Sequence, residues 1–241
     1  MIYSFLQNGD CAVTVQFENE ISEEVNRRVT DLCNRIEAKG INGVIELVPT
    51  FASLTVFYDC TVITSKKLKK KIKALINDGE NSVKSTAKVW NIPVCYDDEF
   101  ALDMKNVCEH TSLKKEEVIR LHTSKPYLIY MLGFLPGFAY LGGMDERLFT
   151  PRLKTPRLEI FEGAVGIGSE QTGIYPIASP GGWQLIGKTP VKVFDKSKES
   201  PILYKAGDYI KFFSIDKAEF TEIEKQVENG TYTPTVSEGV E

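Results

Sequence analysis

Three arginines fall close together in a segment that prolines stiffen. Arg147, Arg152 and Arg157 are three of the seven arginines in the chain, and Pro151 and Pro156 lie between them. A guanidinium group presents a planar fork of donors that suits a carboxylate or a phosphate. The spacing therefore indicates an anion-binding site. The alternative is an ordinary surface loop whose arginines pair with nearby carboxylates, namely those of Asp145, Glu146, Glu159 and Glu162.

A second group of polar and aromatic side chains follows the arginines. Amide, hydroxyl and indole groups beside glycines that allow close approach are common in small-molecule pockets. The alternative is a set of well-formed turns with Trp183 as a core residue. Under the first interpretation, the substrate-binding residues are Arg152, Arg157, Gln171, Thr172, Tyr175, Ser179, Trp183 and Gln184.

One stretch matches a phosphate-binding motif. Residues Gly182 to Thr189 fit the P-loop pattern G-x-x-x-x-G-K-T. A P-loop needs a helix N-terminus that faces the phosphates. Here Pro190 follows, and the next residues alternate between apolar and charged as in a strand. We interpret the match as a coincidence, which a helix beginning at Lys188 would overturn.

The other candidates for chemistry are weaker. His122, one of two histidines, lies near the end of an expected helix, which favours a structural role. Cys108 and His110 are too isolated to form a metal site, and no residue can be named as a general base. A lysine-rich helix is expected to present a solvated face, with a polyanion site as the alternative. Its lysines are Lys66, Lys67, Lys69, Lys70, Lys71 and Lys73.

Composition is that of an ordinary globular protein. The 241 residues are 42% hydrophobic and 26% charged, with a formal net charge of −4. These values exclude a disordered or collagen-like chain and argue against a nucleic-acid-binding protein. Five widely spaced cysteines predict reduced thiols and a cytoplasmic location. The uncharged stretch 126–144 contains Pro136 and four glycines, so we expect a buried strand and a tight loop there, not a membrane span.

Strand and helix patterns alternate over the first part of the chain. Residues 12–17, 44–48, 54–58 and 88–94 have strand patterns. Ser22 is a candidate N-cap for a helix that ends at Gly40, and Ser65 for a helix that ends at Gly79. The order strand–helix–strand–strand–helix–strand predicts an α+β domain of ferredoxin-like type over residues 1–85. The polar stretch 79–88 is the expected linker.

Turn residues dominate the second part, residues 86–241. Two short helices are expected at 101–108 and 113–122, the second capped by Ser112. From Gly133 to Gly187 the chain holds 11 of its 18 glycines. Short strands separated by glycine and proline turns predict a mainly-β barrel domain.

Several blocks in this second part resemble the subunit-1 carboxyltransferase-domain family. They are GFLPGFAYLGG, two copies of TPR, QTGIYP, SPGGW followed by LIG and TP, and the late GDYIKFF. The family includes the B-type (PxpB) subunits of 5-oxoprolinase, allophanate hydrolase subunit 1 proteins and the sporulation kinase inhibitor KipI. The chain departs from the family pattern at Lys188, where Arg is usual, and in the segment 160–165. A changed ligand preference is expected if that segment borders the pocket.

The resemblance implies a ferredoxin-like first domain and a cyclophilin-like β-barrel second domain. It also implies a subunit-2-type (PxpC-like) partner and a lactam-opening (PxpA-like) subunit. Together they would convert 5-oxo-L-proline to L-glutamate with hydrolysis of ATP, used with Mg by the complex, and this chain would be inactive alone. Arg152 and Arg157 would then bind carboxylate or phosphoryl oxygens. Two alternatives stay open, an inhibitor of a sporulation histidine kinase and a subunit of a urea or amide carboxyltransferase.

Overall fold

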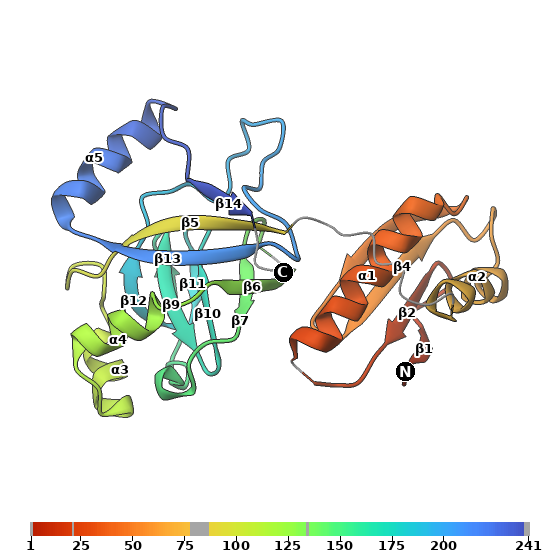
Figure 1. Cartoon of the computed structure of the whole chain (residues 1–241), viewed down its shortest axis with the longest axis horizontal. Coiled ribbons are helices and arrows are strands. Elements are labelled where there is room, and N and C mark those ends of the chain that lie inside the picture. Colours follow the sequence, from red (N-terminus) through yellow and green to blue (C-terminus); the bar gives the residue numbers. More distant parts are fainter. Residues whose placement is uncertain (1, 21, 78–86, 134, 239–241) are drawn as a thin grey trace. The chain divides into compact units, whose positions relative to one another are not determined.

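The chain divides into two compact units, Met1–Ser85 and Thr86–Glu241 (Figure 1). The structure is a computed structural model that describes residues 2–20, 22–77, 87–133 and 135–238. Most of the expected linker at 79–88 lies outside these described residues. Each unit encloses a hydrophobic core of its own.

The first unit is a four-stranded antiparallel sheet covered by two helices. Its strands follow the order β1-β2-β4-β3. They are β1 (Ser4–Gln7), β2 (Ala12–Gln16), β3 (Val44–Pro49) and β4 (Ser53–Tyr58). Helices α1 (Glu23–Lys39) and α2 (Ser65–Asn77) pack on the face that carries Val13, Val15, Leu54 and Val56.

Local signals determine both ends of α1. The Ser22 side chain accepts a hydrogen bond from the Val25 N–H, and Gly40 ends the helix in the left-handed conformation with φ 55°. This conformation is easily reached by glycine, which lacks a Cβ. The prediction of this helix and of both its caps is confirmed.

The strand composition of the first unit differs from the prediction. Residues 88–94 do not complete its sheet, because they form part of β5 (Lys88–Cys95) in the second unit, parallel to β13 (Tyr209–Ile215). The edge position next to β2 is taken by β1, which the sequence pattern did not reveal. The expected last strand therefore exists, but its partner lies far away in the sequence.

A closed barrel of seven strands forms the second unit. The strands follow the order β12-β9-β10-β7-β6-β13-β5, and β5 pairs with β12 to close the ring. The further barrel strands are β6 (Tyr127–Leu132), β7 (Ala139–Gly142), β9 (Ala164–Gly168), β10 (Gln171–Ile174) and β12 (Gln184–Lys188). The predicted mainly-β barrel is thus confirmed, and 126–144 contributes strands β6 and β7 to it.

Smaller strands lie outside the closed ring. β14 (Val236–Glu238) adds to β5, and β8 (Arg157–Ile160) pairs with β11 (Ser179–Gly181) as a separate two-stranded sheet. The β8–β11 sheet carries two of the predicted site residues, Arg157 and Ser179.

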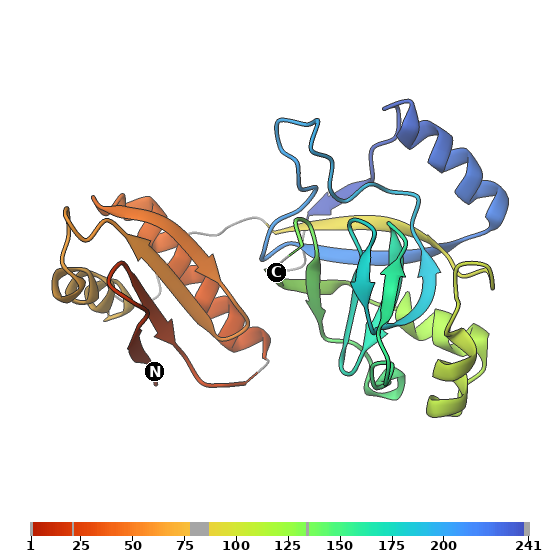
Figure 2. The same cartoon turned by 180° about the vertical axis from the view of Figure 1, so that it is seen from behind.

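Helices cover the barrel on two sides. Helices α3 (Met104–Thr111) and α4 (Lys115–His122) contribute Met104, Val107, Val118 and Leu121 to the barrel core. Helix α5 (Lys217–Glu228) packs through Phe220 beside Cys95 of β5, on the side of β5 and β13 away from α3 and α4 (Figure 2). Ser112 does not cap α4 as expected; it is the left-handed C-cap of α3, and Lys114 precedes α4.

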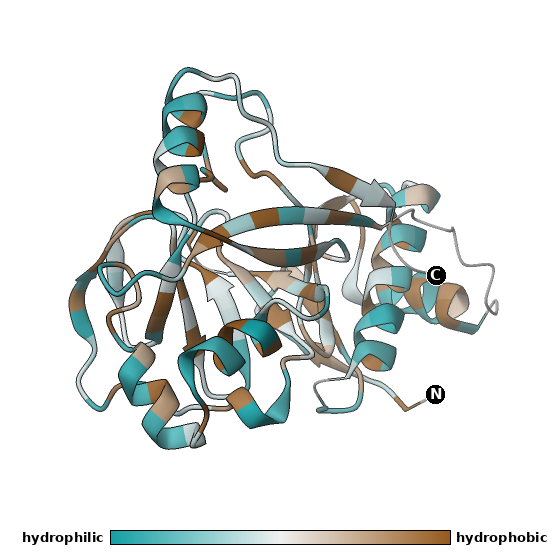
Figure 3. Ribbon diagram, turned by 60° about the vertical axis from the view of Figure 1, so that its left-hand side comes forward, coloured by the Kyte–Doolittle hydropathy of each residue, from teal (hydrophilic) through white to brown (hydrophobic). Residues whose placement is uncertain are grey.

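Hydropathy follows this arrangement. Hydrophobic and hydrophilic residues alternate along the helices and many of the strands, as amphipathic elements around a core require (Figure 3). Within the described ranges, no helix is both long and apolar enough to cross a membrane. The five cysteines are free thiols.

Candidate functional site

The Trp183 indole rests directly on the backbone of two barrel strands. A Cβ added at Gly168 of β9 would overlap the indole Nε1, and a Cβ at Gly173 of β10 would lie 3.1 Å from the six-membered ring. Glycine at these positions therefore leaves the space that the indole fills. Trp183 is buried, with 4% of its surface exposed.

Three further aromatic rings surround Trp183. The ring centroids of Phe138, Tyr140 and Tyr175 lie 5.4, 6.5 and 6.3 Å from that of Trp183, each in an edge-to-face arrangement. We call these four residues the Trp183 cluster. Burial raises the pKa of Tyr175, while the nearby arginines Arg152 and Arg157 act in the opposite direction. The Tyr175 hydroxyl is therefore neutral at physiological pH and able to donate a hydrogen bond.

Arg152 provides a free positive charge at this cluster. Its guanidinium carbon lies 5.8 Å from the Trp183 ring centroid, within the range of a cation–π contact. The side chain is exposed, and no carboxylate of the described residues forms an ion pair with it. By contrast, Arg147 pairs with Asp145 at 2.8 Å, as the surface-loop alternative predicts. Arg152 thus remains available to an incoming anion.

Arg157 is engaged by an acidic residue, Asp103, that lies far from it in the sequence. Its Nη2 donates to Asp103 Oδ1 at 2.8 Å, and Asp103 is buried with 3% exposure. The other oxygen of Asp103 accepts a hydrogen bond from the Leu185 backbone N–H at 2.7 Å. Asp103 therefore joins α3, β8 and β12, and it fixes the direction of the Arg157 guanidinium.

Three of the predicted residues carry a buried polar atom without a partner among the described residues. These atoms are Arg157 Nη1, Gln171 Nε2 and Ser179 Oγ. A buried donor or acceptor that makes no hydrogen bond is rare in native proteins and calls for a water or a ligand. Arg157 and Ser179 belong to the same β8–β11 sheet, in which Arg157 lies opposite Gly181 and Ser179 lies opposite Ile160. Gln171 lies opposite Gly168, on which the indole rests.

Thr172 and Gln184 differ from these residues, because their polar side-chain atoms contact other protein groups. Side chains alternate along β10, so Gln171 and Gly173 share the face of the Trp183 cluster while Thr172 points into the barrel. There the Thr172 hydroxyl lies 2.8 Å from His122 Nε2 and donates to the Gly166 carbonyl. Gln184 Nε2 donates to the Pro151 carbonyl at 2.9 Å. Both side chains therefore already have protein partners.

His122 has the structural role that its position predicted. It is fully buried, stacks on Phe212 and lies 2.8 Å from the Tyr96 hydroxyl through Nδ1. Burial lowers its pKa from 6.5 to about 3. Since the Thr172 hydroxyl donates to a carbonyl, it accepts from the His122 Nε2–H, and Nδ1 accepts from Tyr96. This neutral histidine links α4 to β10 inside the barrel.

The P-loop match is a coincidence, as the proline and the strand pattern after it predict. Lys188 is the last residue of strand β12, and no helix begins there. Its ammonium group lies 3.6 Å from Glu224 of α5 and 5.3 Å from the Phe220 ring centroid. Lys188 and Glu162 together line a cavity of about 130 Å³ next to α5. The two family departures therefore meet at one place, with Lys188 tied to α5.

The matching family model is described as the carboxyltransferase domain, subdomain C and D, and it covers residues 3–204. The chain belongs to this family. It is 40% identical to the B-type subunit of 5-oxoprolinase from Bacillus subtilis (strain 168) over 90% of this chain and 95% of that protein. The corresponding 5-oxoprolinase subunit from Haemophilus influenzae is 43% identical over 85% of this chain and 94% of that protein.

A solved structure supports the same fold. The crystal structure of TTHA0988 superposes with a TM-score of 0.76 at 33% identity. The match covers 85% of this chain and 40% of the TTHA0988 chain. This chain therefore corresponds to a part of a longer polypeptide in that protein.

Proposed function

We propose that this chain is the B-type subunit of an ATP-dependent 5-oxoprolinase. The observation that carries the proposal is the 40% identity to a 5-oxoprolinase subunit of that type over nearly the whole length of both chains. The proposed reaction opens the lactam of 5-oxo-L-proline to give L-glutamate, in a complex with a subunit-2-type protein and a lactam-opening subunit. We also propose the ferredoxin-like and cyclophilin-like types for the two units.

The chemistry of 5-oxoproline fits the surroundings of the Trp183 cluster. This molecule combines a carboxylate, a flat lactam and a small apolar ring. Arg152 supplies an unpaired cation, the aromatic rings supply an apolar wall, and the unpartnered Gln171 Nε2 supplies a donor for a carbonyl oxygen. In this proposal Arg152 binds the carboxylate and Gln171 orients the lactam.

Activation of the lactam requires a group that stabilises negative charge. Amide resonance makes a lactam carbon a poor electrophile, and transfer of a phosphoryl group to its oxygen creates a leaving group. Donors aimed at the oxygens would stabilise that transfer. Arg157 Nη1 and Ser179 Oγ are the unpartnered polar atoms next to the arginine-bearing strand β8.

No ATP-binding residue is assigned to this chain. The one P-loop match lies on a strand, and in the described part of the chain no three His, Cys, Asp or Glu side chains gather as metal ligands. Our proposal gives the use of ATP and Mg to the complex as a whole. The substrate-binding role of this chain and the nucleotide chemistry are therefore tested separately.

The test is reconstitution with matched arginine variants. We expect the chain, copurified with its two partner subunits, to release glutamate from 5-oxoproline only when ATP is present. Arg152→Gln should raise KM for 5-oxoproline at least about tenfold, since it removes one charge-assisted contact worth about 1.5–3 kcal/mol. Arg147→Gln, whose parent pairs with Asp145 on the surface, is the control and should leave KM unchanged.

Two results would contradict the proposal. One is the absence of any complex or of ATP-dependent turnover. The other is an equal effect of Arg152→Gln and Arg147→Gln on KM. If turnover is absent, the two open alternatives, inhibition of a histidine kinase and carboxyl transfer to urea or an amide, would be measured next with the same purified chain.

A further inference from the structure

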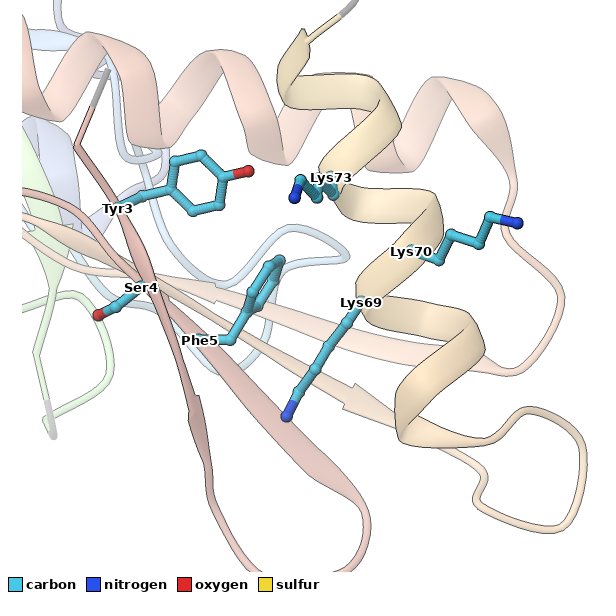
Figure 4. Close-up of a pocket in the computed structure, with 6 residues that line it drawn as sticks. All are labelled: Tyr3, Ser4, Phe5, Lys69, Lys70 and Lys73. Atoms are coloured by element: carbon cyan, nitrogen blue, oxygen red, sulfur yellow. The ribbon is translucent and has the colours of Figure 1, made fainter.

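A groove in the first unit lies between strand β1 and helix α2. Its volume is about 500 Å³, and it is lined by Tyr3, Ser4, Phe5, Lys69, Lys70 and Lys73. Figure 4 shows the rings of Tyr3 and Phe5 turned toward α2, with the Lys73 ammonium group directed toward Tyr3 and the Lys69 side chain running beside Phe5. We call this feature the β1–α2 groove. It combines apolar ring surface with positive charge.

The positive charge of the groove has no counterpart in the described structure. Helix α2 has the sequence SKKLKKKIKALIN, which contains no acidic residue. No lysine of α2 takes part in an ion pair formed by the residues that the structure describes. The chain as a whole carries a net charge of −4, so these lysines make α2 a basic region of an acidic protein.

The lysines are also distributed unevenly around the helix. At 100° per residue, one sector of about 100° contains Lys66, Lys69, Lys70 and Lys73, and the next sector contains Lys67 and Lys71. The groove is lined by Lys69, Lys70 and Lys73, and not by Lys66, Lys67 or Lys71. Both sets are separate from the buried residues Leu68 and Ile72, which hold α2 on the sheet. A ligand in the groove would therefore distinguish between the two sets.

The other wall of the groove is the free edge of a sheet. β1 is the last strand in the order β1-β2-β4-β3, and among the residues that the structure describes it pairs only with β2. An edge strand leaves a row of backbone N–H and C=O groups available to another strand. Successive side chains of β1 alternate, so Tyr3 and Phe5 face α2 while Leu6 points to the opposite side, where it is 48% exposed.

We propose that the β1–α2 groove binds an extended acidic segment of a partner protein, which pairs with the edge of β1 as an added strand. Such a strand would place every second side chain next to the lysines and the others next to Leu6. The fitting segment therefore alternates acidic and apolar residues. This inference does not depend on the proposed lactam chemistry, which belongs to the second unit.

A protein strand fits these features better than a nucleic acid does. Nucleic-acid binding relies on many phosphate contacts along an extended basic surface. Here the basic surface is one side of one helix on an acidic chain, and a backbone edge with pairing groups adjoins it. Only a polypeptide uses both the charge and the edge.

The test measures binding of a fluorescent peptide to the full chain. The probe is an eight-residue peptide of alternating Glu and Val, followed by fluorescence anisotropy at low and moderate salt. Lys69→Glu/Lys73→Glu should weaken binding about tenfold or more, because it reverses two charges at the groove. The control Lys67→Glu/Lys71→Glu makes the same change of net charge on the other side of α2 and should weaken binding much less. Circular dichroism verifies that both variants fold.

A second probe separates strand addition from simple charge attraction. The same peptide with N-methyl groups on alternate residues keeps its charge but loses the N–H donors that pair with a strand edge. We expect it to bind at least about tenfold more weakly than the parent peptide.

Three outcomes would overturn the proposal. They are no peptide binding up to millimolar concentration, equal losses for the two lysine pairs, and equal affinity of the N-methylated peptide. Tighter binding of a single-stranded oligonucleotide or of anionic phosphatidylserine vesicles, lost in the Lys69→Glu/Lys73→Glu variant, would also overturn it by identifying another class of ligand.

Discussion

At the scale of single residues, the Trp183 cluster depends on glycines, which have no side chain to displace the indole. An indole can lie flat on a sheet only where the strands beneath it have no side chains, and Gly168 and Gly173 supply that surface. The same indole then offers a face to Arg152. Two of the many glycines that predict a barrel in the sequence therefore also leave the space that the Trp183 indole fills.

Replacement of Gly168 tests this arrangement. Gly168→Ala would place a methyl group against the indole Nε1 and displace the ring, so we expect a loss of about 1–3 kcal/mol in the free energy of unfolding. Gly182→Ala is the control, because the nearest atom to its added Cβ is 3.6 Å away. Urea denaturation measures both, and equal stability of the two variants would contradict the packing argument.

Buried Asp103 forms an ion pair with the half-buried Arg157, and this pair orients the arginine. Arg157→Gln leaves the Asp103 carboxylate in a buried site with fewer donors, so we expect a loss of about 2–3 kcal/mol. The double variant Asp103→Asn/Arg157→Gln removes that buried charge and should recover part of the loss. The exposed pair of Arg120 and Glu117 provides the control, since Arg120→Gln should change stability little. A double variant less stable than the sum of the single changes would refute this interpretation.

At the scale of elements, the sequence predicts those helix and strand features that depend on residues close together in the chain. The cap at Ser22, the apolar period and Gly40 define α1 in the sequence and in the structure. Strand β5 is equally visible as a pattern, yet its pairing with β13, β14 and β12 depends on residues far along the chain. Similarly, Arg157 is visible as a candidate, but its partner Asp103 belongs to a different part of the sequence. The pairing of residues that lie far apart in the chain therefore cannot be predicted from a single sequence.

The buried histidine that links α4 to the barrel predicts how the free energy of unfolding depends on pH. His122 has a pKa of about 3 in the folded chain and an ordinary value of 6.5 when exposed. Between these values the unfolded chain binds a proton that the folded chain does not, so the free energy of unfolding falls as the pH falls. One such proton contributes a slope of about 1.4 kcal/mol per pH unit.

The slope is assigned to His122 by comparison of variants. His122→Gln should lower stability at neutral pH, because it disturbs the contacts with Tyr96 and Thr172, but it should lack this part of the acid dependence. His110→Gln, which changes the exposed histidine, should retain it. Denaturation at a series of pH values provides the measurement. An unchanged slope in His122→Gln would show that the proton binds elsewhere.

At the scale of the whole molecule, the two units have separate cores. In the described part of the chain, the first core contains only residues of Met1–Ser85, and the barrel clusters contain only residues of Thr86–Glu241. The two candidate sites divide in the same way, since the Trp183 cluster lies in the second unit and the β1–α2 groove in the first. A partner bound at one unit can therefore be studied without disturbing the core of the other.

This separation predicts two independent unfolding transitions. Both tryptophans, Trp90 and Trp183, belong to the second unit, so tryptophan fluorescence reports on the barrel alone while circular dichroism reports on both units. Ile72→Ala removes buried volume from the first core and should lower the stability of that unit by about 2–5 kcal/mol. We expect the circular dichroism curve to gain an earlier phase while the fluorescence midpoint stays unchanged. Leu141→Ala, in the barrel core, should do the reverse and shift the fluorescence midpoint. A shift of the fluorescence midpoint by Ile72→Ala would mean that the two units unfold as one, because a loss of stability in one core would then be shared by the other.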